Sequence, residues 1–282
     1  MYKCFKVKKL IVPVIILLCV VLTGKKFFSN ACQEEKDIEL PVIMYHSIYT
    51  DSPSEYAVSP EQIENDLKWL SEKGYKSVSA QNLCDYVFNN KTLPEKSVMI
   101  TLDDGYYNNL PVLVPLLEKY DMCAVVSIVG KYTNEYAEKD PNNLNYSYLT
   151  WNDVNELIKS GRIEIGNHTY DMHSLYNGRK GCAKNAYESE ENYVSAVSAD
   201  ISLMQEKIKE NTGISAFVFA YPFGAVSPEC RPVLRENGFL VTLTCRETVN
   251  YINHNPKCLL GIGRFNRSGL YSTEEFMRKI FS

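Results

Sequence analysis

Residues 98–106 read VMITLDDGY, an uncharged run that ends in two adjacent carboxylates and a glycine. The run over 98–102 predicts a buried strand, because short apolar segments bounded by turn residues are typical of strands covered on both faces. Catalytic groups in parallel α/β barrels lie at the carboxyl ends of strands. Asp103 and Asp104 take that place and point in different directions, so one can bind a metal while the other serves as a base. A polar turn around Gly105 is the structural alternative.

Short apolar runs alternate with amphipathic segments on both sides of this stretch. Upstream, residues 59–62 predict a helix start, with serine as the cap and proline in the first turn. Strands followed repeatedly by helices imply a parallel sheet, and this number of units predicts an α/β barrel or a partial one. The predicted strands cover 42–45, 98–102, 123–129, 163–165, 216–220 and 239–243, and the predicted helices cover 60–74, 80–89, 109–120, 150–160, 188–211, 228–237 and a last segment from Thr273.

The N-terminal residues predict where in the cell the protein is located, and they are not expected to belong to the folded domain. Four lysines precede an uncharged run of 14 residues, 10–23, which is shorter than a spanning helix and typical of a signal peptide. Two lysines stand between this run and the small-residue cleavage site at 29–31, so an uncleaved signal anchor is the alternative. We therefore expect residues 1–31 to be a signal peptide or anchor plus linker. The working domain, residues 38–282, would lie outside the cytoplasm, secreted or anchored to the outer face of the membrane.

The composition disfavours several classes of function. The 30 lysines and arginines against 34 aspartates and glutamates give 30 − 34 = −4, a net charge that argues against a nucleic-acid-binding protein. No predicted strand leads into a glycine-rich phosphate loop, which argues against a nucleotide enzyme. Seven of the nine cysteines lie beyond the N-terminal segment, scattered and without a CxxC pair. A disulfide framework or a cysteine–zinc site is therefore not expected, and individual pairings stay open.

A second polar segment follows the predicted strand at 163–165. The chain has only four histidines, and two of them, His168 and His173, fall within six positions directly after this strand. Two imidazoles and one carboxylate are a common ligand set for Zn²⁺ or a similar divalent cation, with positions left for water and substrate. Together with the upstream carboxylates, the two histidines predict a metal site.

A third segment, Tyr221-Pro222-Phe223-Gly224, follows the predicted strand at 216–220. An aromatic-proline-aromatic-glycine turn at the end of a strand could line a sugar-binding groove and present a backbone N–H to an oxyanion. A rigid structural turn accounts for the same residues equally well.

Together the three segments resemble the polysaccharide deacetylases, also called NodB-homology or carbohydrate esterase family 4 enzymes. The segment at Asp103 is similar to the family's Thr-Phe-Asp-Asp-Gly motif, with Leu102 at the Phe position. Residues 168–173 are similar to its His-Ser/Thr…His motif, and residues 220–224 to its Arg-x-Pro-Tyr-Gly motif. The likeness covers roughly residues 40–282, and it implies a distorted (β/α)7-type barrel with a single catalytic domain.

The resemblance also implies roles for particular residues. Asp103 would be the general base, and Phe223, with Tyr221 and Pro222 in the same turn, would present its backbone N–H to the oxyanion. The expected cofactor is Zn²⁺, and the ligand chemistry also admits Co²⁺, Ni²⁺ or Mn²⁺. The implied metal ligands are Asp104, His168 and His173.

The sequence departs from the family pattern at three places. The two histidines are five residues apart, where the family has four. Ala220 replaces the arginine that orients the base, and the late Leu-x-His segment that supplies a general acid is missing. Residues 41–46 are similar to the N-terminal strand of the branch that deacetylates poly-β-1,6-N-acetylglucosamine, which makes His46 the candidate acid. Arg264 is the candidate for the missing arginine. A core histidine and a structural salt bridge are the respective alternatives.

The implied activity is metal-dependent removal of N-acetyl groups from an N-acetylglucosamine-type polysaccharide of the cell surface or cell wall. An O-acetyl esterase of the same fold and an inactive glycan-binding module are the alternatives. A glycan is the only expected partner, and contact with a membrane would be made only through the N-terminal segment. The identity of the polysaccharide and the oligomeric state stay open.

Overall fold

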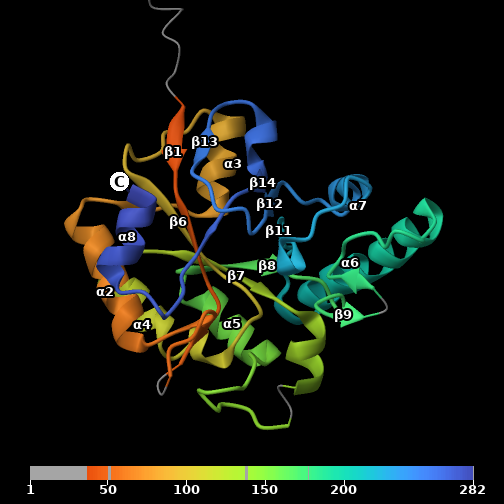
Figure 1. Cartoon of the computed structure of the whole chain (residues 1–282), viewed down its shortest axis with the longest axis horizontal. Helices are drawn as coiled ribbons and strands as arrows, with labels where there is room; N and C mark the ends of the chain where they lie inside the picture. The colour runs from red at the N-terminus through yellow and green to blue at the C-terminus, as the bar shows by residue number, and fades with distance from the viewer. Residues whose placement is uncertain (1–36, 50–51, 137–138, 177, 282) are drawn as a thin grey trace, which may run out of the picture. The chain divides into compact units, whose positions relative to one another are not determined.

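The strand that ends at the two carboxylates is β6, Ser97–Leu102, and all six of its residues are buried. In this computed structural model it lies inside the main sheet, between β2, Val42–Tyr45, and β7, Ala124–Ile128; β6 and β7 are labelled in Figure 1. Residues that alternate along β6 face different layers. Val98, Ile100 and Leu102 belong to the apolar layer shared with the outer helices, whereas Met99 belongs to a second apolar cluster that includes residues of α3, Ala80–Asn89. The structure describes residues 37–49, 52–136, 139–176 and 178–281.

The main sheet is a curled path of parallel strands. Its order is β14-β12-β11-β8-β7-β6-β2-β15, with β5 paired to β6, and every pairing in it is parallel. The predicted distorted α/β barrel is therefore confirmed. Parallel strands bring their carboxyl ends to one edge, so the segments that follow β2, β6, β8 and β11 meet there. The strand bounds are β2 Val42–Tyr45, β5 Lys76–Ser77, β7 Ala124–Ile128, β8 Ile163–Asn167, β11 Val218–Ala220, β12 Val241–Leu243, β14 Leu260–Ile262 and β15 Phe265–Asn266.

Helix starts follow the capping signals of the sequence. Ser59 caps α2, Pro60–Glu72, and Thr150 caps α5, Trp151–Lys159; in both, the N3 side chain returns the hydrogen bond to the cap. Such a cap stabilises a helix by about 1 kcal/mol. The predicted helix over 109–120 begins later, as α4, Leu113–Lys119, because Pro111 lacks the N–H that a helix interior needs; Pro115 is tolerated in the first turn of α4. The remaining helices are α6 Glu190–Thr212, α7 Cys230–Glu236 and α8 Thr273–Phe281.

Several short strands had no counterpart in the sequence patterns. The first residues of the expected working domain, Ile38–Leu40, form strand β1, which pairs antiparallel with β13, Asn250–Ile252. A small hairpin, β9 Leu175–Tyr176 and β10 Arg179–Lys180, follows the second histidine. Strands β3, Ser47–Ile48, and β4, Ala57–Val58, pair beside β2. Strands of two or three residues are too short to show an alternating pattern, so only the folded chain reveals them.

The predicted signal or anchor segment, 1–31, lies outside the described residues. Among the helices that the structure does describe, none is long and apolar enough to cross a membrane.

Candidate active site

A cleft of about 650 Å³ opens where the carboxyl ends of the strands meet. It contains most of the residues that the sequence singled out, and they come from the segments that follow β2, β6, β8 and β11. The predicted site residues that line it are His46, Asp103, Asp104, His168, His173 and Phe223.

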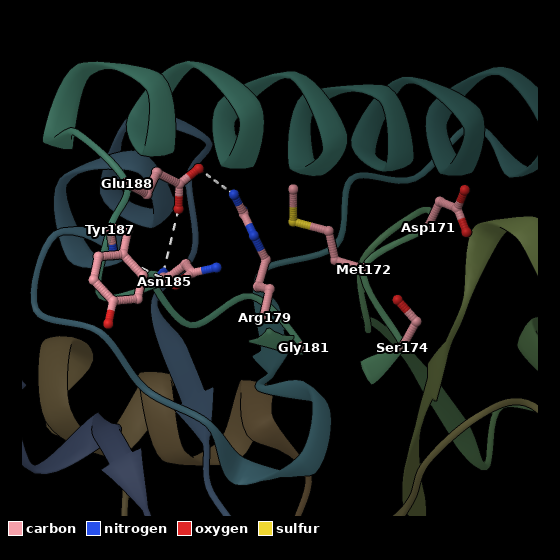
Figure 2. Close-up of a pocket in the computed structure, with 8 residues that line it drawn as sticks. All are labelled: Asp171, Met172, Ser174, Arg179, Gly181, Asn185, Tyr187 and Glu188. Atoms are coloured by element: carbon pink, nitrogen blue, oxygen red, sulfur yellow. Dashed lines mark hydrogen bonds and ion pairs between the residues drawn. The ribbon is translucent and has the colours of Figure 1, made fainter. Parts of the chain in front are cut away.

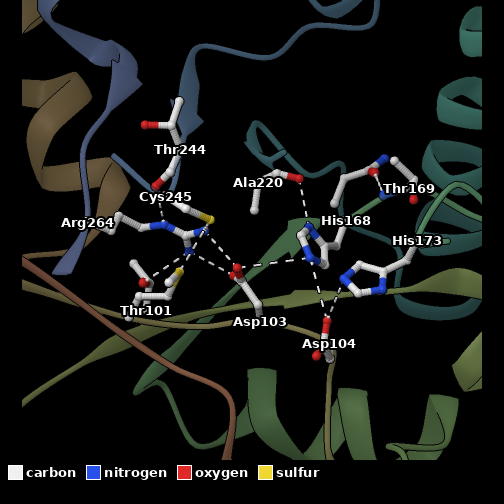
Figure 3. Close-up of polar contacts among 12 residues, drawn as sticks. Thr101, Asp103, Asp104, His168, Thr169, His173, Ala220, Thr244, Cys245 and Arg264 are labelled. Carbon is white, nitrogen blue, oxygen red and sulfur yellow. Dashed lines mark hydrogen bonds and ion pairs between the residues drawn. The ribbon is translucent and has the colours of Figure 1, made fainter. Parts of the chain in front are cut away.

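The two carboxylates after β6 diverge because the backbone turns sharply between them. Asp104 has a φ of 72° and Gly105 a φ of 75°, both in the left-handed region. A side chain at Gly105 would stand 2.9 Å from a carbon of Ile128, so glycine is required at this close approach. As Figure 3 shows, the turn directs Asp103 toward Arg264 and Asp104 toward the two histidines.

Asp104 and the two imidazoles form a compact cluster of possible metal ligands. Their donor atoms all lie within 4.8 Å of one another. Asp104 Oδ1 lies 3.2 Å from His173 Nε2 and 3.6 Å from His168 Nε2. This oxygen is buried and has no hydrogen-bond partner, which would be costly unless something else binds it.

Protonation states agree with a cation at this place. His168 Nδ1 lies 2.7 Å from the carbonyl oxygen of Ala220, which can only accept, so Nδ1 carries the proton and Nε2 offers a lone pair to the cluster. Burial lowers the pKa of His168 to about 3, which keeps the imidazole neutral as a ligand must be. Burial raises the pKa of Asp104 to about 6, and the charge of Asp103 adds to this shift. A divalent cation would relieve that penalty, so the residues fit one.

Asp103 is held by a buried arginine. Arg264 donates from Nη1 to Asp103 Oδ1 at 2.8 Å and from Nη2 to Oδ2 at 2.7 Å, and its Nε donates to the carbonyl oxygen of Thr244 at 2.9 Å. Burial by itself would raise the pKa of Asp103, but the charge and hydrogen bonds of Arg264, with a contribution from His168, hold it well below its usual range. The carboxylate is therefore ionised and fixed in orientation.

His46 follows β2 and lines the same cleft. Its Nδ1 is buried without a hydrogen-bond partner, and its ring lies edge-on to Tyr56 at a centroid distance of 5.1 Å. Burial lowers the pKa of His46, although Asp104 and Asp103 oppose the shift. A buried polar ring nitrogen without a partner is uncommon outside functional sites.

The turn after β11 contributes one of its three predicted residues to the cleft wall. Phe223 has a φ of 58° and lies with its ring 4.5 Å from that of His173. Tyr221 and Pro222 are buried, and the ring of Tyr221 packs edge-on against Phe219 in the core. Of the three, only Phe223 therefore lines the cleft, because the chain leaves β11 in a short 3₁₀ turn that keeps Tyr221 and Pro222 buried and leaves Phe223 partly exposed.

Some residues of the cleft were not expected from the sequence. Tyr132 approaches His173, with its hydroxyl 3.4 Å from Nδ1 and 3.3 Å from the carbonyl oxygen. Cys245 lines the cleft next to Arg264, and Lys180 enters it from the β9–β10 hairpin. None belongs to a motif, and each reaches the site only through tertiary packing. The fourth histidine, His254, does not line the cleft and stacks on Tyr86.

Comparison with known proteins agrees with this geometry. A family model described as polysaccharide deacetylase matches residues 90–242. The chain belongs to the polysaccharide deacetylase family. The match includes the carboxylate pair, both histidines and the turn after β11.

Curated and solved relatives in this family are distant in sequence. The chain is 25% identical over 218 residues to poly-β-1,6-N-acetyl-D-glucosamine N-deacetylase of Escherichia coli, a match that covers 70% of this chain but 32% of that protein. The Staphylococcus aureus enzyme of the same name is 26% identical over 214 residues, covering 74% of this chain and 70% of the relative. The solved structure of IcaB from Ammonifex degensii superposes with a TM-score of 0.69 at 25% identity, covering 83% of this chain and 93% of that one. The chain thus spans about a third of the length of the Escherichia coli relative.

Proposed function

We propose that the protein is a metal-dependent hydrolase that removes N-acetyl groups from an N-acetylglucosamine-type polysaccharide. The observation that carries the proposal is the joint placement, in one cleft, of an ionised carboxylate clamped by Arg264 and a cluster of three metal-ligating side chains. A base next to a cation site is an arrangement that can hydrolyse an unreactive amide, because the cation activates water and the base takes its proton.

Asp104, His168 and His173 would hold the cation, and Zn²⁺ is the proposed metal because neutral imidazoles and one carboxylate are its common ligands. A divalent cation bound there would make water more acidic and polarise the acetamide carbonyl. The hydrogen bond from His168 Nδ1 to Ala220 fixes the ring that presents Nε2.

Asp103 would accept the proton of the attacking water as the water oxygen bonds to the carbonyl carbon. Its two oxygens are both engaged by Arg264, which keeps the carboxylate ionised and oriented. Arg264 therefore acts as a positioning residue that replaces the arginine missing at position 220.

The backbone N–H of Phe223 would stabilise the negative charge on the former carbonyl oxygen. His46 would then give a proton to the departing amine as the C–N bond breaks, which yields acetate and a free amino sugar. Because burial lowers the pKa of His46, its protonated form is a stronger acid than a free imidazolium and gives up its proton more readily.

The relatives' names support an N-acetylglucosamine polymer as the substrate, since the Escherichia coli and Staphylococcus aureus proteins are both named for deacetylation of the β-1,6-linked polymer. Half-exposed aromatic side chains at the cleft, Tyr56 and Tyr271, offer stacking surfaces for sugar rings. The basic and apolar N-terminal segment supports action outside the cytoplasm, by a secreted or membrane-anchored protein.

Acetate release from a panel of glycans tests the proposal. The full chain with Zn²⁺ is incubated with β-1,6-linked N-acetylglucosamine oligomers, chitooligosaccharides, peptidoglycan and acetylated xylan. Preferred release from the β-1,6-linked oligomers supports the proposed substrate. Release from xylan alone would replace the amidase by an O-acetyl esterase, and binding without release would indicate a glycan-binding module.

A further inference from the structure

The β9–β10 hairpin forms a wall between two cavities. Successive residues of a strand face opposite sides. Arg179 lines a neighbouring cavity of about 400 Å³, where it pairs with Glu188 (Figure 2), whereas Lys180 lines the catalytic cleft. In the described part of the chain Lys180 forms no ion pair, so its ammonium group is available to whatever occupies the cleft.

The hairpin is anchored to the turn that carries Phe223. A side chain at Gly181 would stand 2.7 Å from the carbonyl oxygen of Pro222, so the two backbones are in direct contact. Beyond it, the carbonyl oxygen of the buried Cys182 accepts a hydrogen bond from the hydroxyl of Tyr193 at 2.7 Å, and the backbone N–H of Lys184 donates to Ser227 Oγ at 2.8 Å. This packing fixes the base of the hairpin, and thereby Lys180, on the β11 side of the cleft.

A carboxylate without a counter-ion lines the other side. Glu55 is exposed, lines the cleft and shares a hydrogen bond with Tyr56, and none of the ion pairs in the described residues includes it. Its carbonyl oxygen accepts a hydrogen bond from Asn266 of β15 at 3.0 Å. Along the curled sheet, β8, β7 and β6 separate β11 from β2, and β15 lies beyond β2 at the end of the sheet. Lys180 and Glu55 therefore lie on opposite walls.

The other charges at the cleft are compensated. Glu247 pairs with Lys279 at 2.6 Å, and Asp103 pairs with Arg264. Asp104 belongs to the metal cluster. Among the described residues that line the cleft, the uncompensated charges are thus one cation on the β11 wall and one anion on the β2–β15 wall.

We propose that Lys180 and Glu55 sort the sugars that flank the reacting one by charge, an inference that rests on the proposed N-deacetylase function. A sugar that has lost its acetyl group carries an amine that takes up a proton. Such a cationic sugar is repelled on the Lys180 wall and attracted on the Glu55 wall, whereas a neutral acetylated sugar is accepted on both. Deacetylation along one polymer chain then proceeds with a preferred direction, because each new product is tolerated on one flank only.

Two isomeric trisaccharides test this inference. Both are β-1,6-linked and carry one glucosamine, at the reducing end in one isomer and at the non-reducing end in the other; the fully acetylated trimer is the reference. Tandem mass spectrometry follows acetyl loss from the central sugar with the zinc-loaded full chain. We expect kcat/KM to differ between the isomers by about twofold to fivefold, the range of exposed charge pairs.

The variants assign the difference to its source. Lys180→Gln should raise kcat/KM for the poorer isomer, and Glu55→Gln should lower it for the better one. Lys184→Gln is the matched control on the same loop, because Lys184 does not line the cleft, and it should leave the ratio unchanged. The ratio should also approach one at 1 M salt, where the Debye length falls to about 3 Å. Binding of both isomers to Asp103→Asn, followed by calorimetry, should show the same order without turnover.

Equal handling of the two isomers, or a ratio that neither variant alters, would overturn the inference while leaving the deacetylase intact. Failure to release acetate from any trimer, the fully acetylated one included, would overturn the proposed function and the inference together.

Discussion

Asp103 and Arg264 are both almost completely buried, so each can stay charged only because the other compensates its charge. Their side chains are 3% and 0% exposed. Removal of one partner from a buried pair leaves an uncompensated charge and typically costs about 3–5 kcal/mol. Arg264→Met should therefore lower the free energy of unfolding by this amount, measured by urea denaturation, and should abolish acetate release.

The double variant separates stability from catalysis at this pair. Asp103→Asn combined with Arg264→Met removes both charges, so its loss of stability should be smaller than the sum of the two single losses. Acetate release should nevertheless stay absent, because no carboxylate remains to take the proton. Strictly additive losses of stability would contradict the description of the pair as mutually dependent.

His46 offers a second prediction at the residue scale. An amine leaves a tetrahedral intermediate only after it is protonated, whereas an alcohol or phenol leaves more easily. His46→Asn should therefore reduce N-acetyl hydrolysis by about 10²-fold or more, the usual contribution of a general acid, and reduce hydrolysis of 4-nitrophenyl acetate far less. Equal losses on the amide and the ester would indicate that His46 shapes the cleft rather than donating a proton.

Residue chemistry could be predicted from the sequence where a short motif carries it. The carboxylates after β6 and the histidines after β8 each lie within a few positions of one another, so local spacing alone suggested a shared task. The partner of Asp103 could only be suggested, because Arg264 and Arg267 are equally near the last strand. Folding assigns Arg264 to Asp103 and Arg267 to Asp66, a choice made by strand register.

At the scale of elements, the Arg267–Asp66 pair connects the segment that follows β15, late in the chain, to helix α2, early in the chain. Arg267 Nε donates to Asp66 Oδ2 at 2.6 Å, and Asp66 also accepts from Tyr45 of β2 at 3.0 Å and from Thr273 of α8 at 2.6 Å. The network joins β2, α2 and α8, and the side chains of the ion pair are 0% exposed. It therefore fixes the last helix against the first part of the barrel.

Arg267→Met should destabilise the protein by about 3–5 kcal/mol, because Asp66 would stay buried without its counter-charge. The folded fraction should keep its acetate release, since the pair does not line the cleft. Lys68→Gln is the control on α2: its pair with Glu72 is exposed, at 3.9 Å, and its loss should cost no more than about 0.5 kcal/mol in thermal or urea unfolding. A similar effect of both substitutions would mean that the network is not cooperative.

Whether a helix or strand could be predicted from the sequence depended on its length. Each long helix and each central strand has a pattern in the sequence, because burial on one face repeats over several turns or residues. Strands of two residues, such as the β9–β10 hairpin, have no such pattern and arise from packing against elements far away. Lys180 enters the cleft from one of these, which is why the sequence did not indicate it.

At the scale of the whole molecule, the two ends of the barrel differ. The carboxyl ends of the strands carry the site residues, which extend from His46 to Arg264 in the sequence. At α3, the carboxylate of Glu164 on β8 accepts hydrogen bonds from the first backbone N–H groups of the helix, at 2.7 Å and 3.0 Å. Residues of α3 belong to the second apolar cluster together with residues of the sheet. The division resembles that of other α/β barrels, with reactivity at one end and stability at the other.

The proposed mechanism depends on one cation at Asp104, His168 and His173, which enables Asp103 to act as a base. The most direct test is to strip the full chain with a chelator and add back Zn²⁺ stepwise while following acetate release from a β-1,6-linked N-acetylglucosamine pentamer. We expect the rate of acetate release to rise linearly with bound Zn²⁺ and to reach its maximum at one equivalent. Asp103→Asn should bind the same single equivalent and release no acetate. Acetate release that is independent of zinc, or that survives in Asp103→Asn, would show that the enzyme does not work through a cation and the Asp103 base.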